Sequence, residues 1–311
     1  MHFTLKQLRY FDAALRCGSI AGAAEAMNIS QSSVTAALDN IEQSVGQELF
    51  RRVPAKGLIV TEAGRLVGAR IADFLETARV FESDLMSLSG DLTGTLHVGC
   101  YAPTAPHVLP RLMRALAALY PAIRVELVET DMQAMVELLQ AGRIDLALTY
   151  GRMVPDKLPF LPMFDARPWA LLPMDSPLAN QPNVSLEDLS RQPFVILDLP
   201  NSVDYFRAIF SEHGLTISVT HTTKSSSVLR GLVSGGFGHS ILNICCAADR
   251  DQSNGYLARP ISGELLTPVF GVAYSQASAR SSVVRAVLSI CEDLSRKQAF
   301  RDLVLAPPPP A

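Results

Sequence analysis

The sequence predicts an α/β protein with a helix-turn-helix at its N-terminus, one long helix after it, and a larger domain of alternating strands and helices. Three observations predict this. Residues 19–46 are expected to form two short helices joined by a tight turn, because apolar side chains recur at helical spacing on both sides of Asn28. Residues 62–89 keep an apolar repeat without a slip. Segments typical of strands and helices then alternate along the rest of the chain.

Length and composition narrow the class of protein. The 311 residues are enough for about two domains, and 48% hydrophobic residues can supply a sizeable core. The net charge of −3 does not favour a nucleic-acid partner, but phosphate contacts need positive charge only locally. Five scattered cysteines, no zinc-like spacing and no long apolar run indicate a cytoplasmic protein with no membrane segment, no metal and no cofactor.

The first sixty residues predict three capped helices. Thr4, Ser19 and Ser30 each precede an apolar-periodic segment, and such hydroxyl residues accept hydrogen bonds from the free N–H groups of a helix start. Gly18 is expected to end the first helix, and Asn28 to take the left-handed conformation of the turn. The third helix has a predicted core face formed by Val34, Leu38, Ile41 and Val45.

A wing is expected directly after the third helix. Residues 49–52 and 58–60 suit two short strands, and the Lys-Gly pair between them suits their tip. Residues 1–60 carry six basic and five acidic side chains, so this domain is nearly neutral. Its basic groups that are best placed to contact phosphates are Arg51, Arg52 and Lys56.

The long helix carries a heptad-like apolar seam within residues 61–90. Its members alternate in spacing between four and three, and they are Val67, Ile71, Phe74, Ala78, Phe81, Leu85 and Leu88. Such a seam favours pairing with a second copy of the helix, which makes a homodimer. The alternative is a helix that packs on its own domain.

In the remainder of the chain, segments with the spacing typical of strands alternate with segments that have helical spacing. Strands are expected at 96–99, 124–128, 145–149, 169–172 and 194–197, and helices at 109–119, 132–142, 203–213 and 228–234. This order predicts a parallel sheet whose ligand-binding loops follow the carboxyl ends of its strands.

From Leu5 to Gly64 the sequence resembles, without a gap, the winged helix-turn-helix of LysR-type transcriptional regulators. The shared motifs include Ala23-Ala24, Ser30-Gln31, residues 49–52 and residues 61–64. The resemblance implies a double-stranded DNA operator as partner. It also implies a recognition helix whose base-facing side chains are Gln31, Ser32, Ser33 and Thr35.

The recognition helix departs from the family pattern. The family often has proline at position 32 and basic residues near 36, 39 and 40, where this chain has Ser32, Ala36, Asp39 and Asn40. Guanine readout by arginine from this helix is therefore excluded, whereas Gln31 can pair with adenine. We therefore expect affinity to depend more on dimerisation, and specificity to depend more on DNA shape and the wing.

Residues 109–129, 138–151, 174–179 and 229–242 resemble the effector domain of the same family, which is built in two lobes like a periplasmic solute-binding protein. The resemblance implies that 91–305 is the effector domain. Lobe I would comprise 91–162 and 267–305, and lobe II 163–266, with crossings near Pro162 and Leu266. A proline-rich tail, 306–311, would follow, and the family implies a homotetramer.

An effector pocket is expected between the lobes. Its candidate residues follow strand ends or begin helices, and they are Tyr101, Ala102, Thr104, Tyr150, Gly151, Asn201, Ser202, Ser225, Ser226 and His239. Thr104 begins the segment that leads into a helix, so its hydroxyl and the N-terminal amides of that helix could bind a carboxylate. We therefore expect a small organic acid. Serine and threonine residues at such positions serve as structural loop caps about as often as they bind a ligand, so each one also has a purely structural interpretation.

The predicted function is regulation of transcription by a non-enzyme. Cys100 with His97 or His107 suggests a thiol nucleophile, but no third orienting group is identifiable, and no catalytic residue is expected. The alternative is a cytosolic small-molecule-binding protein or enzyme whose N-terminal helices serve only for oligomerisation.

Overall fold

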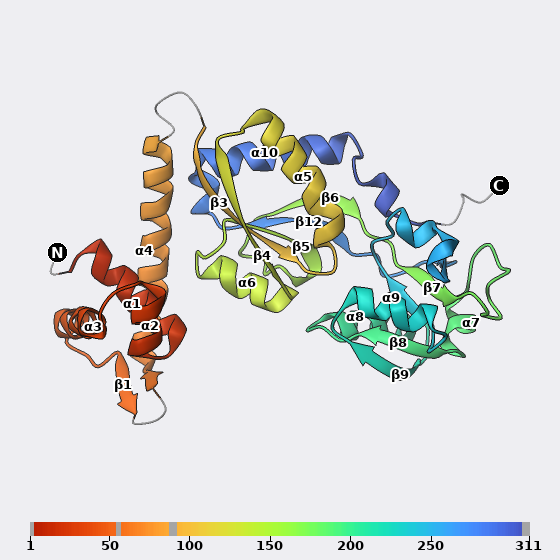
Figure 1. The fold of residues 1–311 in the computed structure, drawn as a ribbon, viewed down its shortest axis with the longest axis horizontal. Helices are drawn as coiled ribbons and strands as arrows, with labels where there is room; N and C mark the ends of the chain where they lie inside the picture. The colour runs from red at the N-terminus through yellow and green to blue at the C-terminus, as the bar shows by residue number, and fades with distance from the viewer. Residues whose placement is uncertain (1–2, 54–56, 87–91, 307–311) are drawn as a thin grey trace.

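The computed structural model describes residues 3–53, 57–86 and 92–306. Figure 1 shows three parts in a row: the N-terminal domain with the long helix α4, a central α/β lobe, and a second lobe at the far end. Within the described residues, no helix combines the length and the apolar character needed to cross a bilayer.

The N-terminal domain, here called the head, is a winged helix-turn-helix as predicted. Its elements are α1 (Leu5–Cys17), α2 (Ile20–Ala26), α3 (Gln31–Val45), β1 (Phe50–Val53) and β2 (Gly57–Val60). Thr4, Ser19 and Ser30 all cap their helices through side-chain oxygens, and Gly18 and Asn28 both take positive φ. The two strands pair antiparallel.

The head core confirms most of the predicted apolar face of α3. Val34, Leu38 and Ile41 are buried against Phe11, whose ring lies 4.9 Å from that of Phe50. Val45, in contrast, is 41% exposed, so its assignment to the core was wrong. It is the last residue of α3, whose C-cap is Gly46, and with Leu8, Leu66 and Phe74 it lines an open apolar hollow.

Helix α4 (Glu62–Met86) has a divided surface. Ile71 is buried in the head core and Val67 packs against that core, so both seam residues contact their own domain. Phe74, Phe81 and Leu85 are exposed, and Ala78 is half-buried. Leu88 lies outside the described residues. The first part of the seam therefore packs on its own domain, and pairing through the exposed part stays a prediction.

Lobe I is built on a five-stranded sheet in the order β4-β3-β5-β12-β6. Its elements are β3 (Gly94–Tyr101), α5 (Ala105–Leu119), β4 (Ile123–Thr130), α6 (Met132–Gln140), β5 (Leu146–Tyr150), β6 (Phe160–Asp165), β12 (Val269–Tyr274) and α10 (Ser282–Arg296). Strands β3, β4 and β5 are parallel, but β12 runs antiparallel to both neighbours. The predicted parallel sheet is confirmed for β3, β4 and β5, and β12 runs against them because the chain returns from lobe II at the carboxyl ends of these strands.

Lobe II is also mixed. Its elements are β7 (Trp169–Pro173), α7 (Leu186–Ser190), β8 (Pro193–Leu197), α8 (Ser202–Ser211), β9 (Ser218–Thr223), α9 (Ser226–Ser234), β10 (Ser240–Leu242) and β11 (Tyr256–Pro260). Strands β8 and β9 are parallel, whereas β7 is antiparallel to β10 and β11. A bridge between Phe194 and His239 links the two groups of strands.

The chain crosses between the lobes later than predicted. Pro162 lies inside β6, which continues in the lobe I sheet to Asp165. The outgoing and returning strands meet where the N–H of Ala166 donates to the carbonyl oxygen of Pro268 (2.9 Å). Pairing with β12 keeps β6 in lobe I as far as Asp165, so the crossing lies a few residues after Pro162, and the return passes close to Leu266.

Candidate functional site

The first turn of α3 presents polar side chains to solvent. Gln31, Ser32 and Ser33 are exposed, and Thr35 is half-buried. The Ser30 hydroxyl lies 2.9 Å from that of Ser32 and 2.8 Å from that of Ser33, so these side chains form one cluster around the cap. This arrangement suits hydrogen bonds to base edges or phosphates.

The wing presents two exposed arginines, each beside a carboxylate. Arg52 Nη2 lies 2.6 Å from Oδ1 of Asp39 on α3, and Arg51 Nε lies 3.4 Å from Oε2 of Glu48. Exposed pairs of this kind contribute at most about 1 kcal/mol, so a phosphate can displace the carboxylate. Lys56, the third predicted contact, lies outside the described residues.

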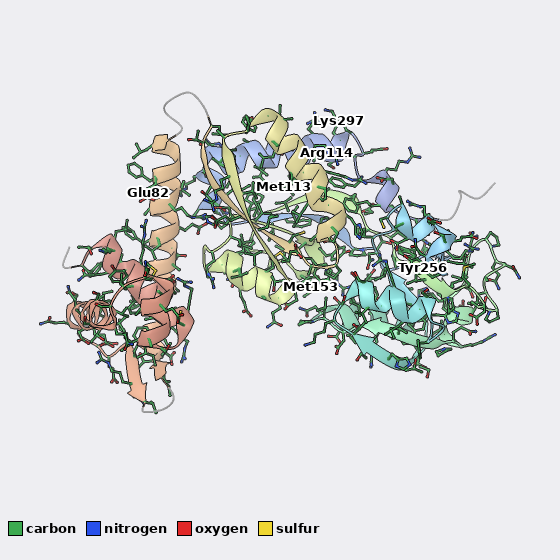
Figure 2. The ribbon with its side chains drawn as sticks, viewed as in Figure 1. Glu82, Met113, Arg114, Met153, Tyr256 and Lys297 are labelled. Atoms are coloured by element: carbon green, nitrogen blue, oxygen red, sulfur yellow. The ribbon has the colours of Figure 1, made fainter. Side chains whose placement is uncertain are left out.

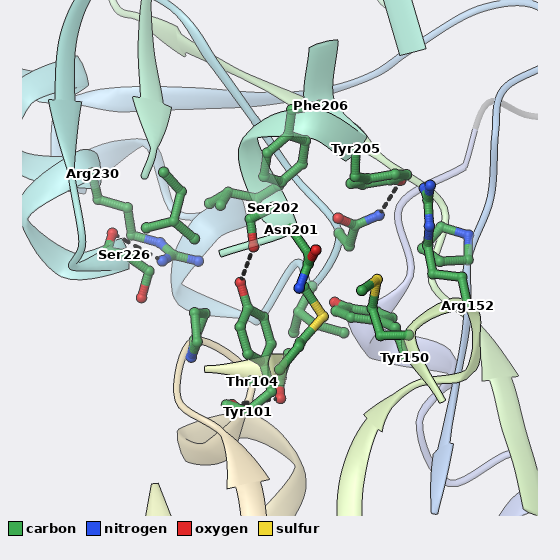
Figure 3. Close-up of a pocket in the computed structure, with 18 residues that line it drawn as sticks. Tyr101, Thr104, Tyr150, Arg152, Asn201, Ser202, Tyr205, Phe206, Ser226 and Arg230 are labelled. Atoms are coloured by element: carbon green, nitrogen blue, oxygen red, sulfur yellow. Dashed lines mark hydrogen bonds between the residues drawn. The ribbon is translucent and has the colours of Figure 1, made fainter. Parts of the chain in front are cut away.

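A pocket lies between the two lobes, at the carboxyl ends of β3 and β5 (Figure 3). Its walls mix aliphatic, polar and aromatic side chains, and the aromatic ones are Tyr101 and Tyr150 from lobe I and Tyr205 and Phe206 from lobe II. The open space inside is only about 30 Å³, which suits a few water molecules. The two lobes are therefore closed on each other.

One hydrogen bond joins the lobes across this pocket. The Tyr101 hydroxyl of β3 lies 2.7 Å from the Ser202 hydroxyl at the start of α8 (Figure 3). Burial raises the pKa of Tyr101 to about 12, although the hydrogen bond with Ser202 opposes the rise. Both hydroxyls are therefore neutral and bind each other as donor and acceptor.

Six of the ten predicted effector residues line the pocket, namely Tyr101, Thr104, Tyr150, Asn201, Ser202 and Ser226. Ala102, Gly151, Ser225 and His239 do not. Ser225 instead caps α9, and His239 is buried with Nε2 2.7 Å from the Ser176 hydroxyl. These two residues therefore have structural partners and lie outside the lining of this pocket.

Thr104 lines the pocket in a different role from the one predicted. Its side chain is 1% exposed and makes no capping bond to α5. Its hydroxyl donates instead to the carbonyl oxygen of Tyr101, at 2.9 Å. The expectation that this hydroxyl is free to bind a carboxylate was therefore wrong for the closed pocket.

Sequence reasoning missed two arginines at the pocket. Arg230 of α9 makes a bidentate pair with the buried Asp249, at 2.6 and 3.0 Å, so its charge is compensated. Arg152 is exposed, with its Cζ 4.9 Å from the centre of the Tyr205 ring. No carboxylate of the described residues forms an ion pair with Arg152. Its position one residue after the predicted pair Tyr150-Gly151 was the signal that could have found it.

Asn243 connects the pocket with the hinge, by which we mean the two segments that cross between the lobes near Ala166 and Leu266. Its side-chain nitrogen donates to the carbonyl oxygen of Ala166 on the outgoing strand and to the Tyr205 hydroxyl, both at 2.7 Å. The Tyr205 hydroxyl donates in turn to the carbonyl oxygen of Leu266 on the returning strand, at 3.0 Å. Asn243 and Tyr205 therefore connect both segments that cross between the lobes with the pocket wall.

The thiol considered as a nucleophile is inert in this structure. Cys100 is fully buried, and burial raises its pKa to about 12, so no thiolate forms near neutral pH. The Nδ1 of His97 faces Arg79 and Asp145 instead. Among the residues that the structure describes, no group of three metal-binding side chains comes together.

Two family models match the chain. Residues 5–65 match the bacterial regulatory helix-turn-helix protein of the lysR family, and residues 89–296 match the LysR substrate binding domain. The RuBisCO operon transcriptional regulator of Allochromatium vinosum is 29% identical over 245 residues, which cover 78% of this chain and 80% of that protein.

Solved structures agree with these matches. HinK, a LysR family transcriptional regulator from Pseudomonas aeruginosa, is 28% identical with a TM-score of 0.61, over 94% of this chain and 98% of HinK. CbnR complexed with its target DNA shares the fold, with a TM-score of 0.64, 20% identity and coverage of 94% of this chain and 100% of CbnR. The chain belongs to the LysR family of transcriptional regulators. It is a DNA-binding regulator with an effector-binding domain.

Proposed function

We propose that this regulator acts in the cytoplasm as a homodimer, assembled further into a homotetramer, on an operator with two symmetric half-sites. The exposed side chains of Phe74, Phe81 and Leu85 on α4 support pairing through that helix. Two heads on one face of the DNA double the contacts of a domain that is weakly basic on its own.

Within each half-site, Gln31 reads a base edge and Ser32, Ser33 and Thr35 assist it, while Arg51, Arg52 and Lys56 contact phosphates. The side-chain amide of Gln31 is exposed at the start of α3 and makes no hydrogen bond within the described residues. A free amide of this kind suits bidentate pairing with adenine.

The effector is a small monocarboxylic acid with an apolar body, bound between the lobes. The observation that carries this proposal is Arg152, an uncompensated guanidinium beside an aromatic pocket. Arg230 already holds Asp249, so the pocket offers one free positive charge within the described residues. The apolar walls suit the body of the ligand, and the small volume requires the lobes to part on entry.

The DNA-binding half is tested by fluorescence anisotropy with DNA from directly upstream of this protein's own gene, at two salt concentrations. Saturable, salt-sensitive binding that outcompetes random DNA is expected. Repeating the titration with pooled metabolites tests whether an effector is required. No specific binding in either condition would favour a head that only oligomerises.

The effector half is tested by thermal unfolding with aliphatic and aromatic monocarboxylates, each compared with its uncharged amide. We expect at least one acid to raise the melting temperature in a concentration-dependent way and its amide to have no effect. Arg152→Gln should abolish the shift, and Arg114→Gln, an exposed arginine on α5 (Figure 2), should retain it. Equal binding of acids and amides would contradict the proposal.

A further inference from the structure

Two charged side chains of α4 dock this helix on lobe I of the same chain. Glu76 is 5% exposed, and its Oε1 accepts a hydrogen bond from the Ser275 hydroxyl at 2.6 Å. One turn later, Arg79 forms an ion pair with Asp145, in which Nη1 donates a hydrogen bond to Oδ2 at 2.7 Å. Asp145 is itself buried, so this contact is an interior one rather than a passing surface contact.

His97 completes this group of side chains, which we call the clamp: Glu76, Arg79, His97, Asp145 and Ser275. The main-chain N–H of His97 donates to Oδ2 of Asp145 at 2.7 Å, and its Nδ1 lies 2.9 Å from Nη1 of Arg79. Burial on its own raises the pKa of Asp145, but the hydrogen bonds from His97 and Arg79 outweigh it and lower that pKa. Asp145 therefore carries a full negative charge for Arg79 at neutral pH.

The backbone of lobe I approaches α4 closely at the clamp. Gly142 has φ +62°, and a Cβ added there would lie 3.0 Å from the Cβ of Glu76. A larger residue would be strained in this backbone conformation and would press on the helix. The loop before β5 is thus shaped to receive α4.

Three strands of lobe I connect the clamp with the pocket. Asp145 directly precedes β5, which ends at Tyr150 in the pocket wall. His97 lies in β3, which ends at Tyr101. Ser275 directly follows β12, which begins beside Pro268 at the hinge. Because strands in one sheet move as a unit, a displacement at the pocket edge reaches the clamp without local deformation.

We propose that Glu76 and Arg79 are positioning residues that fix the angle between the DNA-binding head and lobe I, so that closure of the pocket changes the geometry of the bound DNA. This inference rests on the proposed function of the interlobe pocket. The head core holds the N-terminal half of α4 through Ile71, and the clamp holds the C-terminal half, so one rigid helix spans both domains. Without the clamp, the state of the lobes no longer sets the direction of the head.

The test combines one substitution that weakens the contact between the lobes with one that breaks the clamp. Tyr101→Phe removes the hydrogen bond to Ser202, and Arg79→Gln removes the pair with Asp145. DNA bending is measured by fluorescence energy transfer on a site selected by the wild-type protein from a random-sequence pool. We expect Tyr101→Phe to change the bend in the wild-type background and to lose about half or more of that effect in Arg79→Gln. Arg114→Gln, the matched control in lobe I, should leave the effect intact.

Hydrogen exchange separates loss of the clamp from loss of the fold. In Arg79→Gln, amides of residues 75–82 should exchange about tenfold faster, while those of α1 stay unchanged. Arg79→Lys keeps a charge for Asp145 and should restore part of the coupling. The inference is overturned if Tyr101→Phe leaves the bend unchanged in the wild type, or changes it equally in Arg79→Gln. Failure of the pool to yield any specific site would instead overturn the proposed function.

Discussion

The hydroxyl groups of Tyr101 and Ser202 lie 2.7 Å apart and join lobe I to lobe II inside the pocket. Both side chains are buried, so neither hydroxyl exchanges its partner for bulk water while the lobes stay closed. A ligand that enters the pocket must either break this hydrogen bond or bind beside it. The bond therefore contributes to the contact between the lobes, together with those of Arg250 to the carbonyl oxygens of Asp302 and Val304.

Ser202→Ala leaves the Tyr101 hydroxyl buried without its partner. We expect the variant to lose about 1–2 kcal/mol of unfolding free energy, since an unpaired buried hydroxyl keeps its desolvation penalty. Urea denaturation followed by Trp169 reports this, because the single tryptophan is fully buried in lobe II. A midpoint equal to that of the wild type would mean that the bond does not hold the closed state.

Arg51→Ala combined with Arg52→Ala removes two exposed charges from the wing. We expect weaker DNA binding on all sequences alike and a salt dependence that falls by about one unit of log–log slope per lost phosphate contact. Anisotropy titrations over a salt series measure both quantities. An unchanged slope, with the fold intact by circular dichroism, would exclude the wing as a phosphate contact.

Asp39→Asn removes the carboxylate that Arg52 contacts at 2.6 Å. We expect DNA affinity to rise severalfold, because a carboxylate on the recognition helix repels phosphate and occupies a wing arginine. The same titrations check this prediction, and the gain should disappear when Arg52→Ala is added. A fall in affinity would indicate instead that the pair orients the wing.

Phe74→Asp combined with Phe81→Asp places charges on the exposed face of α4. We expect monomers with little affinity for an operator, because a buried carboxylate opposes pairing of the two helices. Sedimentation velocity gives the assembly state. Asp73→Asn, an exposed neighbour on the same helix, should sediment like the wild type. Retained dimers in the double variant would exclude pairing through this face.

Acid should weaken lobe II through Asp249. Burial raises the pKa of this carboxyl, but hydrogen bonds and charge from Arg230 outweigh it and hold the pKa below the unfolded value of 3.8. A lowered pKa means that the pair stabilises the folded state above the unfolded pKa and that this stabilisation is lost as pH falls through the folded pKa.

Asp249→Asn should therefore cost about 3–5 kcal/mol near pH 7, because Arg230 is left buried without its counter-charge. Its unfolding free energy should also depend less on pH below about pH 5 than that of the wild type. Urea denaturation at several pH values, monitored at Trp169, measures both effects. Equal acid sensitivity in the two proteins would contradict this assignment.

The head could be predicted almost residue by residue because its signals are local. A cap such as Thr4 or Ser30 acts within three residues, and a left-handed turn residue such as Asn28 acts alone. The prediction that Val45 is buried was wrong because burial at the end of a helix depends on its neighbours in space, which periodicity does not contain.

The pocket could be predicted only in part. Strand ends located Tyr101, Tyr150 and Ser202, since the carboxyl ends of strands in such a sheet meet at one edge. Arg152 was not predicted as a pocket residue, because it matters through the absence of a counter-charge among the described residues. That absence depends on neighbours far apart in the chain. The free hydroxyl expected of Thr104 was wrong for a different, local reason: the bend of the loop brings the hydroxyl to the carbonyl oxygen of Tyr101, three residues earlier.

By itself, the sequence determined the elements, their caps, the order of domains and the family, since these follow from spacing and residue type over short stretches. Only the tertiary structure decided which charges remain free, which faces of α4 are covered and how the lobes close. Arg79 and Asp145 illustrate the difference: they lie 66 positions apart, and nothing near either residue in the sequence indicates the other. Their pairing comes from packing α4 on a folded sheet, which brings distant charges together only after both domains exist.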